Sequence, residues 1–266
     1  MAHIYKVIII GASEAGIALA NKLKTEERTV LLISKDFRKL RNKNKLATEI
    51  DMLTAEAIHL TYARGLFGVG VRQADTDGTV YGLKVVFATG SKPIQSALKT
   101  KNIFYSISEI KGKHNNEAIL VYGNNDYAVS AAISLSKQFC KVYLGTEELN
   151  LACTATLKTN LSKLQNVLHL PKCRLQNFRQ NKAAKLTGVT LDAYGTITVS
   201  ALLYSIGRLP DIPSFAKRFL KVSADGFADV SADFESTLVP GVFAIGDLCP
   251  AFSKQDLEKI ASAILD

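Results

Sequence analysis

The stretch Lys6-Val-Ile-Ile-Ile-Gly11-Ala-Ser-Glu-Ala-Gly16-Ile-Ala-Leu-Ala20 decides the fold that the sequence predicts. Its apolar run, Val7 to Ile10, is typical of a parallel strand that helices cover on both faces. A glycine-rich turn follows from Gly11 to Gly16, and Ile17 to Lys24 has the pattern of a helix. This order predicts the start of a dinucleotide-binding βαβ unit, in which phosphates lie at the helix N-terminus.

A second stretch of the same kind begins at Ala118 and reads Ala118-Ile-Leu-Val-Tyr-Gly123-Asn-Asn-Asp-Tyr-Ala128-Val-Ser-Ala-Ala132. One glycine-rich turn is a weak motif, but two of them, each between an apolar strand and an alanine-rich helix, indicate two nucleotides placed to exchange electrons. We therefore expect an α/β protein with two Rossmann-like, three-layer dinucleotide-binding domains.

The composition is that of a globular protein. The 266 residues are 47% hydrophobic and 21% charged, and no apolar run approaches the roughly 18 residues that span a bilayer. No secretory signal is legible at the N-terminus, so we expect a soluble, cytoplasmic protein without a membrane partner. The four histidines are scattered and form no metal-ligand spacing.

The formal net charge is +9, and basic residues crowd between Lys35 and Lys45 and again between Lys172 and Lys185. Such surfaces attract acidic proteins by long-range steering, although a solvated loop face is an equally simple interpretation. Phe37 is the single aromatic residue in the first basic run. No nucleic-acid module is recognisable, so we do not expect nucleic acid as a partner.

Further elements follow from hydrophobic periodicity. The pattern predicts a strand from Thr29 to Ile33, a short helix from Ala55 to Ala63, and a hairpin of Leu66–Val71 with Thr79–Val86 around Asp75–Gly78. In the second half we expect a helix (Val129–Phe139), a strand (Lys141–Leu144), a hairpin (Val189–Ser200), strands at Leu202–Ile206 and Gly241–Ile245, and a closing helix (Gln255–Leu265).

The first turn departs from the dinucleotide fingerprint at two positions. Ser13 stands where a glycine lets the pyrophosphate approach, and Ser34 stands where an acid holds the adenosine ribose. Ser34 could still bond a ribose hydroxyl, and Lys35 or Arg38 could face a phosphate. The alternative is a strand-to-helix turn that binds no ligand.

Four motifs together carry a family resemblance. The motifs are Gly11-Ala-Ser-Glu-Ala-Gly16, Phe87-Ala-Thr-Gly-Ser-Lys-Pro93, Ile206-Gly-Arg-Leu-Pro-Asp211 and Gly241-Val-Phe-Ala-Ile-Gly-Asp247. They occur in the order found in FAD-dependent pyridine-nucleotide oxidoreductases. The chain most resembles the low-molecular-weight, thioredoxin reductase-like group. Thr48-Glu-Ile-Asp51 is similar to part of that group's flavin-side loop, and Lys254-Gln255 to the Arg-Gln pair that opens its last helix.

The resemblance implies an FAD domain built from residues 1–112 and 214–266, with an NAD(P)-binding-like domain, residues 113–213, inserted between them. Asp247 would accept hydrogen bonds from the ribityl hydroxyls, and the amides near Gln255 would face the flavin pyrimidine edge. Homodimers are usual in similar proteins. The FAD-binding residues implied are Gly11, Ala12, Ser13, Glu14, Ala15, Gly16, Ser34, Lys35, Ala88, Thr89, Gly90, Gly246, Asp247, Lys254 and Gln255.

Two departures from that group bear on chemistry. The group has a redox C-x-x-C pair in its middle domain, and this chain has none. Its middle domain contains Asn124-Asn-Asp-Tyr127 and then Cys140 and Cys153, which are thirteen residues apart. Dithiol chemistry needs two sulfurs within bonding reach, so we do not expect it. Cys249 is the one thiol we place near the flavin. The region from Asp51 to Ala88 is short, which predicts a missing helix and a more open flavin edge.

The second turn departs further from the dinucleotide fingerprint than the first. Asn125 replaces the middle glycine and adds a side chain where phosphates would lie, although asparagine tolerates a positive φ. Glu147 would repel a 2′-phosphate and bind a free 2′-hydroxyl, so NADH is the favoured nucleotide; the alternative is that this domain binds none. The candidate nicotinamide-nucleotide residues are Gly123, Asn125, Asp126, Tyr127, Ala128, Glu147 and Gly207.

The function expected from the sequence is that of an FAD-containing oxidoreductase without a dithiol. It would exchange electrons with NADH or with an acidic carrier of the ferredoxin or flavodoxin type, docked on the basic run from Lys35 to Lys45. The catalytic residues and the final acceptor are not legible. The alternative is a non-catalytic nucleotide-binding relative with decayed sites.

Overall fold

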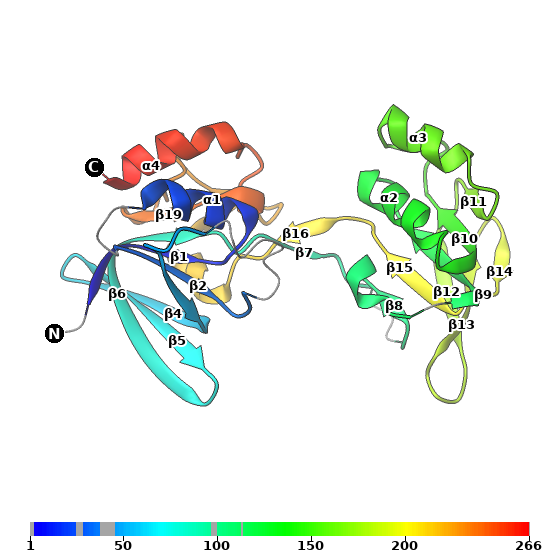
Figure 1. Cartoon of the computed structure of the whole chain (residues 1–266), viewed down its shortest axis with the longest axis horizontal. Coiled ribbons are helices and arrows are strands. Elements are labelled where there is room, and N and C mark those ends of the chain that lie inside the picture. Colours follow the sequence, from blue (N-terminus) through cyan, green and yellow to red (C-terminus); the bar gives the residue numbers. More distant parts are fainter. Residues whose placement is uncertain (1–2, 25–28, 38–45, 97–99, 113, 266) are drawn as a thin grey trace. The chain divides into compact units, whose positions relative to one another are not determined.

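The structure is a computed structural model that describes residues 3–24, 29–37, 46–96, 100–112 and 114–265. The chain divides into two compact units (Figure 1), one formed by Met1–Lys92 with Leu209–Asp266 and the other by Pro93–Arg208. The chain passes between them through β7 (Ser91–Pro93) and β16 (Arg208–Pro210), which pair with each other. Most of the basic run from Lys35 to Lys45 lies outside the described residues.

The unit boundaries fall earlier in the chain than the 112/113 and 213/214 positions expected from the sequence. Residues 93–112 go with the second unit because β8 (Ile103–Phe104) pairs with β15 (Ala201–Tyr204) in that unit's sheet. Residues 209–213 go with the first unit, where the Asp211 amide donates to the Gly90 carbonyl at 2.9 Å.

The first unit is built on one sheet of order β3-β2-β1-β6-β5-β4, with β19 also beside β6. Four strands run parallel to their neighbours in it: β1 (Ile4–Ile10), β2 (Val30–Ser34), β3 (Asp51–Thr54) and β19 (Val242–Ala244). Three form an antiparallel meander: β4 (Glu56–Ala63), β5 (Leu66–Gln73) and β6 (Thr76–Phe87). The helices α1 (Glu14–Leu23) and α4 (Leu257–Leu265) pack together on one side of the sheet (Figure 1).

The helix predicted from Ala55 to Ala63 is wrong, because this segment is strand β4. The short run with Ile58, Thr61 and Tyr62 fits the hydrophobic period of a helix as well as that of a strand. Its hydrogen-bonded pairing with β5 makes it a strand. The neighbouring hairpin is confirmed with a tighter turn than expected. Gln73 pairs with Thr76, so only Ala74 and Asp75 lie outside the ladder. No helix occurs between residues 51 and 88, all of which are described.

The second unit has three layers. Its central parallel sheet has the order β11-β10-β9-β15-β8. One face packs on α2 through Ile119 and Val121, and the other packs on an antiparallel sheet through Leu120 and Leu202. The elements are β9 (His114–Tyr122), α2 (Asp126–Leu135), β10 (Phe139–Gly145), α3 (Ala155–Ser162), β11 (Val167–Leu170) and the antiparallel β12 (Leu175–Gln180), β13 (Leu186–Leu191) and β14 (Gly195–Ile197).

The short elements complete the description. Two small strands, β17 (Lys221–Val222) and β18 (Ala228–Asp229), pair with each other in the first unit. The 3-10 turns are η2 (Ile107–Glu109), η3 (Ser214–Arg218), η4 (Gly246–Leu248) and η5 (Lys254–Asp256). Among the described helices, none has the length and apolar character needed to cross a bilayer.

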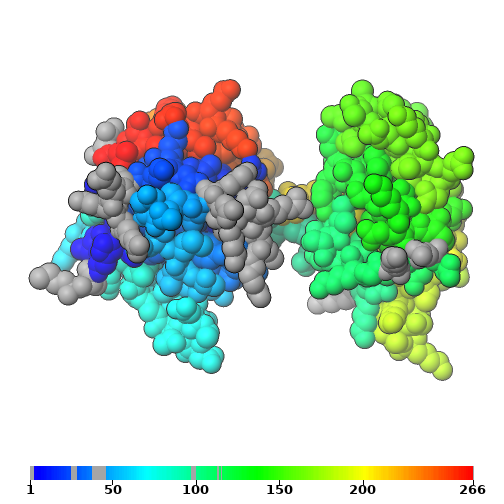
Figure 2. Space-filling view, viewed as in Figure 1, coloured from blue at the N-terminus to red at the C-terminus, as the bar shows by residue number. Residues whose placement is uncertain are grey.

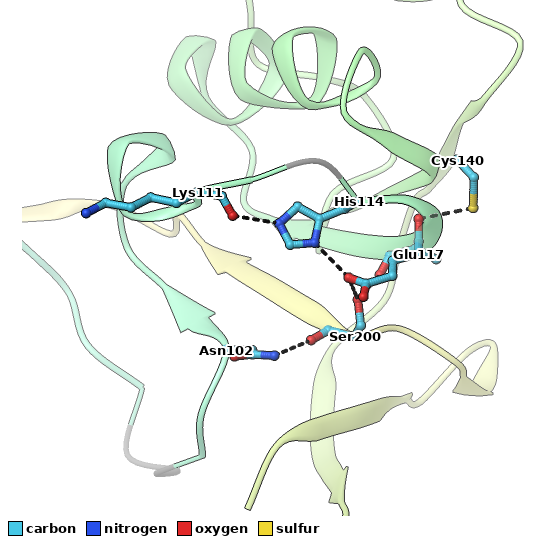
Figure 3. A network of polar contacts seen from close by, with 7 residues as sticks. Asn102, Lys111, His114, Glu117, Cys140 and Ser200 are labelled. Atoms are coloured by element: carbon cyan, nitrogen blue, oxygen red, sulfur yellow. Dashed lines mark hydrogen bonds and ion pairs between the residues drawn. The ribbon is translucent and has the colours of Figure 1, made fainter.

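A polar network ties the start of β9 to its neighbours (Figure 3). The Glu117 carboxylate lies 2.8 Å from His114 Nδ1 and accepts from Ser200 Oγ at 2.9 Å. His114 Nε2 contacts the Lys111 carbonyl, and the Cys140 thiol donates to the Glu117 carbonyl. The hydrogen bonds from His114 and Ser200 lower the pKa of Glu117 below its ordinary 4.5.

Replacing Glu117 with glutamine is expected to remove a pH-dependent share of stability. Because the pKa of Glu117 is depressed in the folded state, its carboxylate stabilises the fold above pH 4.5. That contribution is lost as pH falls through the folded pKa. Urea midpoints of Glu117→Gln should lie below wild type at pH 7 and converge with it as pH falls below 4.5. Asp225→Asn, an exposed carboxylate of the first unit, is the control; equal pH profiles for all three proteins would contradict this.

Candidate functional site

The first turn packs its backbone directly on the end of strand β6. Gly11 has φ +107°, and a Cβ there would lie 2.4 Å from the Ala88 carbonyl oxygen. A Cβ at Gly16 would lie 2.9 Å from that of Ala88. Both glycines are therefore required by close approach. The turn leaves the carboxyl end of β1, where nucleotides bind in open α/β sheets.

Segments far apart in the sequence meet at this turn. A Cβ at Gly246 would lie 3.0 Å from the Ala15 Cβ, and one at Gly90 would lie 3.7 Å from the Ser13 Cβ. Residues 11–16, 88–90 and 246–247 thus form one cluster, as the family resemblance implies. Their role in cofactor binding remains a prediction.

Ser13 serves as the N-cap of α1. Its backbone is extended, and its hydroxyl accepts from the Gly16 amide at 3.2 Å. A serine at this position therefore satisfies one amide of the helix N-terminus itself. Ala12 and Ser13 still line an open cleft.

That cleft has a volume of about 570 Å³ and belongs entirely to the first unit. Its size falls within the range of small-molecule sites. Its walls come from the turn, the end of β2, the start of β4 and a segment that follows β16. The lining residues include Gly11, Ala12, Ser13, Ser34, Lys35, Asp36, Glu56, Ala57, Ile58, Thr89, Asp211 and Phe215.

The polar end of the cleft holds Ser34 and Lys35, two of the predicted FAD-binding residues, together with two acids outside that prediction, Asp36 and Glu56. The Ser34 hydroxyl accepts from the Asp36 amide at 3.3 Å, and Lys35 Nζ lies 2.7 Å from Glu56 Oε1. Glu56 thus brings a carboxylate beside Ser34, where the dinucleotide fingerprint expects one. The sequence gives no signal for this position, because the segment from Ala55 to Ala63 has a helical pattern.

Asp211 ends the Ile206–Asp211 motif and is not among the residues that the resemblance implies for the site. Its carbonyl accepts from the Thr89 hydroxyl at 2.7 Å, and its carboxylate lies 3.0 Å from Lys92 Nζ. These contacts fix the segment up to Phe215 against Thr89, so this segment forms a wall of the cleft.

The residues implied for the flavin side lie outside the cleft lining. Asp247 Oδ2 accepts from the Ser91 hydroxyl at 2.6 Å. Lys254 Nζ lies 2.5 Å from Glu14 Oε1, which joins η5 to the start of α1. Gln255 lies in the same 3-10 turn, which a capping box of Ser253 and Asp256 begins.

Cys249 follows Asp247 closely but is enclosed by the core. It is 5% exposed, its thiol donates to the Ala244 carbonyl, and burial raises its pKa to about 12. A thiol held protonated is a poor nucleophile. All four cysteines are free thiols, and Cys140 is exposed.

A maleimide reagent at pH 7.5 is therefore expected to label Cys140 in the folded protein and to leave Cys249 unmodified until urea unfolds it. Peptide mass spectrometry on samples quenched over time measures both rates. Rapid labelling of Cys249 in the native state would show that its burial is not maintained.

The second turn also leads from a strand into a helix, and its polar side chains bond to neighbouring groups of the same unit. Asn125 is extended at φ −151° rather than positive; its Oδ1 accepts from the Ala128 amide at 2.8 Å and its Nδ2 donates to the Ser205 carbonyl. Asn124 Nδ2 donates to Glu148 Oε2 at 2.7 Å. The Asp126 carboxylate accepts from the Thr154 amide at 2.9 Å.

The other candidate nucleotide residues of this unit also have internal partners. Glu147 accepts from the Tyr122 hydroxyl at 3.1 Å and lies 3.3 Å from Arg174 Nε. Burial, with the Glu147 carboxylate beside it, raises the pKa of Tyr122, so this hydroxyl stays a donor. Tyr127 accepts from the Ile107 amide, and Gly207 accepts from the Ile94 amide.

Among the described residues, no cluster of His, Cys, Asp or Glu could hold a metal ion.

Comparison with known proteins defines the class. The family model of pyridine nucleotide-disulphide oxidoreductases matches residues 34–265. The chain belongs to this family of oxidoreductases, and its two units are the two Rossmann-like domains expected from the sequence.

Particular relatives point to one branch. The chain is 29% identical to the thioredoxin reductase of Borreliella burgdorferi over 201 residues, 71% of this chain and 61% of that protein. It is 25% identical to the thioredoxin reductase of Buchnera aphidicola from Schizaphis graminum, covering 68% of this chain and 62% of that protein. The chain thus spans about three fifths of the length of these curated relatives.

Solved structures share the fold at low identity. T. acidophilum thioredoxin reductase superposes with a TM-score of 0.80 at 17% identity, covering 98% of this chain and 97% of that one. The bacillithiol disulfide reductase of Bacillus cereus gives 0.78 at 16% identity, covering 98% and 99%. These similarities establish the architecture.

Proposed function

We propose that the protein is an FAD-dependent oxidoreductase of the thioredoxin reductase-like type that works without a dithiol. The observation that carries this proposal is the cleft of about 570 Å³ beside Gly11, lined by residues from separate parts of the chain. Its polar end and its position at the carboxyl end of β1 and β2 suit the phosphate and adenosine half of a dinucleotide.

Each cluster then has a role in binding. The amides from Gly11 to Gly16 and the N-terminus of α1 would hold the pyrophosphate. Ser34 and Glu56 would accept hydrogen bonds from the adenosine ribose. Asp247 Oδ1, which accepts no hydrogen bond from the described residues, would bind the ribityl chain. The amides near Gln255 would face the pyrimidine edge. Bound FAD supplies the capacity to accept and release electrons.

The electron source is either NADH or an acidic carrier of the ferredoxin or flavodoxin type, and the acceptor is unassigned. Glu147 supports NADH over NADPH, because a carboxylate repels a 2′-phosphate. No two cysteines of this chain stand in a C-x-x-C pair. We also propose a homodimer, as is usual in similar proteins.

Absorbance of the purified protein tests the proposal. Bands near about 375 and 450 nm indicate bound oxidised flavin. Anaerobic mixing with NADH and NADPH separately then tests the nucleotide preference; bleaching by NADPH alone would overturn it.

A second candidate is a non-catalytic nucleotide-binding relative with decayed sites. The side chains of Ser13 and Asn125, which cap the helices that would hold phosphates, favour it. A colourless protein that FAD cannot reconstitute would support this candidate over the first.

A further inference from the structure

The positive charge of the protein is concentrated in the second unit. Residues 93–208 contain 14 Lys and Arg against 6 Asp and Glu, a formal net charge of +8. The first unit contains 19 against 18. Within the second unit, residues 149–191 contain seven Lys and Arg and no Asp or Glu. The unit therefore carries a field that attracts an acidic partner.

Most acids of this unit bond to groups other than its lysines and arginines, so they do not pair locally with the unit's positive charge. Glu117 bonds Ser200, Glu148 bonds Asn124, and Glu147 pairs with Arg174. Asp126 accepts from the Thr154 amide, and Asp192 from the Arg174 amide.

Four exposed basic residues gather at the end of the β12–β13 hairpin, and we call them the hairpin cations: Lys101, Arg179, Lys182 and Lys185. Lys101 forms a β-bridge with Lys185, and Arg179 pairs with Gly188 in the ladder. Figure 1 shows the hairpin loop extending from the body of the unit, and in Figure 2 this yellow-green segment lies at its surface.

The hairpin end is ordered by contacts that do not involve the cationic groups. Asn181 Oδ1 accepts from the amides of Ala183 and Lys185, each at 3.0 Å. The Lys101 amide donates to the Ala184 carbonyl at 2.9 Å. The backbone is therefore held in place, while the ammonium and guanidinium groups extend into solvent.

Within the described part of the chain, none of the hairpin cations forms an ion pair. Lys185 interacts with the Glu117 carboxylate only by a longer-range electrostatic attraction. Exposed large apolar side chains of the unit, such as Tyr127 and Tyr194, lie elsewhere. Tyr105 lines a pocket with Lys101 and Ala184, but it is half-buried and its hydroxyl accepts from the Ser96 amide at 3.1 Å. A charge cluster without a fully exposed aromatic ring suits an acidic protein better than single-stranded nucleic acid.

The nucleotide turn of the same unit is poorly suited to a dinucleotide. The Asn125 side chain accepts a hydrogen bond from the Ala128 amide, and the Asn124 side chain donates one to the Glu148 carboxylate. Asp126 begins α2, and Glu148 accepts from Asn124 of the turn, so two carboxylates lie at the turn itself. A phosphate would have to break these hydrogen bonds and approach negative charge.

We propose that the hairpin cations are the docking surface for a small acidic protein that carries its own redox group, so that the second unit binds a protein in place of a nucleotide. This inference rests on the proposed function only in that the partner carries a redox group. It assigns a surface distinct from the basic run between Lys35 and Lys45.

Binding of an acidic plant-type [2Fe–2S] ferredoxin to the full chain, followed by biolayer interferometry, tests this. The double variant Lys182→Glu/Lys185→Glu should bind at least about tenfold more weakly, since reversing close charges costs more than removing them. The matched control, Lys137→Glu/Lys163→Glu, makes the same change in net charge at exposed positions of the same unit. It should bind within about threefold of wild type. Raising NaCl from about 50 to 300 mM should weaken wild-type binding and affect the hairpin variant less.

Equal losses in the two double variants, or no ferredoxin binding by wild type, would overturn the docking surface. So would an oligonucleotide that binds more tightly than ferredoxin and shows the same dependence on Lys182 and Lys185. Flavin absorbance of the same samples keeps the two proposals separate. A protein that stays colourless after reconstitution with FAD but binds ferredoxin contradicts the FAD assignment alone, and a yellow protein that does not bind ferredoxin contradicts the docking surface alone.

Discussion

Replacing Gly11 with alanine is expected to yield a protein that does not retain flavin and whose free energy of unfolding is lower by about 2–4 kcal/mol. Backbone strain and steric overlap of the new Cβ both contribute to this loss. The new Cβ would lie 2.4 Å from the Ala88 carbonyl oxygen and 2.7 Å from the Thr89 Cα, at φ +107°. Both neighbours are backbone atoms, so the turn itself must move. That displacement would carry the amides from Ala12 to Gly16 away from the pyrophosphate.

Absorbance at about 450 nm after reconstitution with FAD measures the first effect, and urea unfolding measures the second. Gly78→Ala is the matched control, since a Cβ there meets only Val71 Cγ2 at 3.9 Å. If Gly11→Ala keeps a full flavin spectrum, the first turn does not hold the pyrophosphate, whatever its effect on stability.

Replacing Gly123 with alanine is expected to destabilise the second unit by a similar amount, about 2–4 kcal/mol, while flavin is retained. A Cβ at Gly123 would lie 2.0 Å from the Ser205 carbonyl oxygen, at φ +152°. Ser205 follows β15, so relief of this overlap would separate β15 from β9 in the central sheet. The flavin residues belong to the other unit and keep their packing.

Limited proteolysis measures this local loss better than a single unfolding curve, because a chain of two units need not unfold in one step. Faster cleavage between residues 93 and 208, with an unchanged flavin spectrum, is the expected outcome. Loss of flavin from Gly123→Ala as complete as from Gly11→Ala would mean that cofactor binding depends on both turns, against the assignment of FAD to the first unit alone.

The strand-turn-helix at each turn was predictable because its signal is local. Val7 to Ile10 pairs with β2 and β6, and α1 begins at Glu14, within the Gly11–Gly16 stretch and three residues before the predicted start at Ile17. The family could also be recognised, since the motifs around Gly90 and Asp247 keep their order along the chain. The segment from Ala55 to Ala63 failed for the opposite reason, because its pairing with β5 is what makes it a strand.

The candidate site was predictable only in part. Residues 11–16, 88–90 and 246–247 meet as expected, but Glu56 and Asp211 were missed. Glu56 enters the cleft because the preceding Ala55 amide donates to the Ser34 carbonyl at 3.0 Å, and Asp211 enters it through hydrogen bonds to Thr89 and Gly90. Neither position has a local signature.

The sequence by itself determined that the protein has two βαβ units, that it lacks a C-x-x-C pair, and that it carries excess positive charge, because these properties are local or additive along the chain. Only the tertiary structure decided where that charge gathers and what the polar side chains near each turn do. Ser13 and Asn125 both cap a helix, yet Ser13 lines a cleft, whereas Asn125 also bonds Ser205. The physical reason is that hydrogen-bond partners and exposure come from residues distant in the chain, which packing alone brings together.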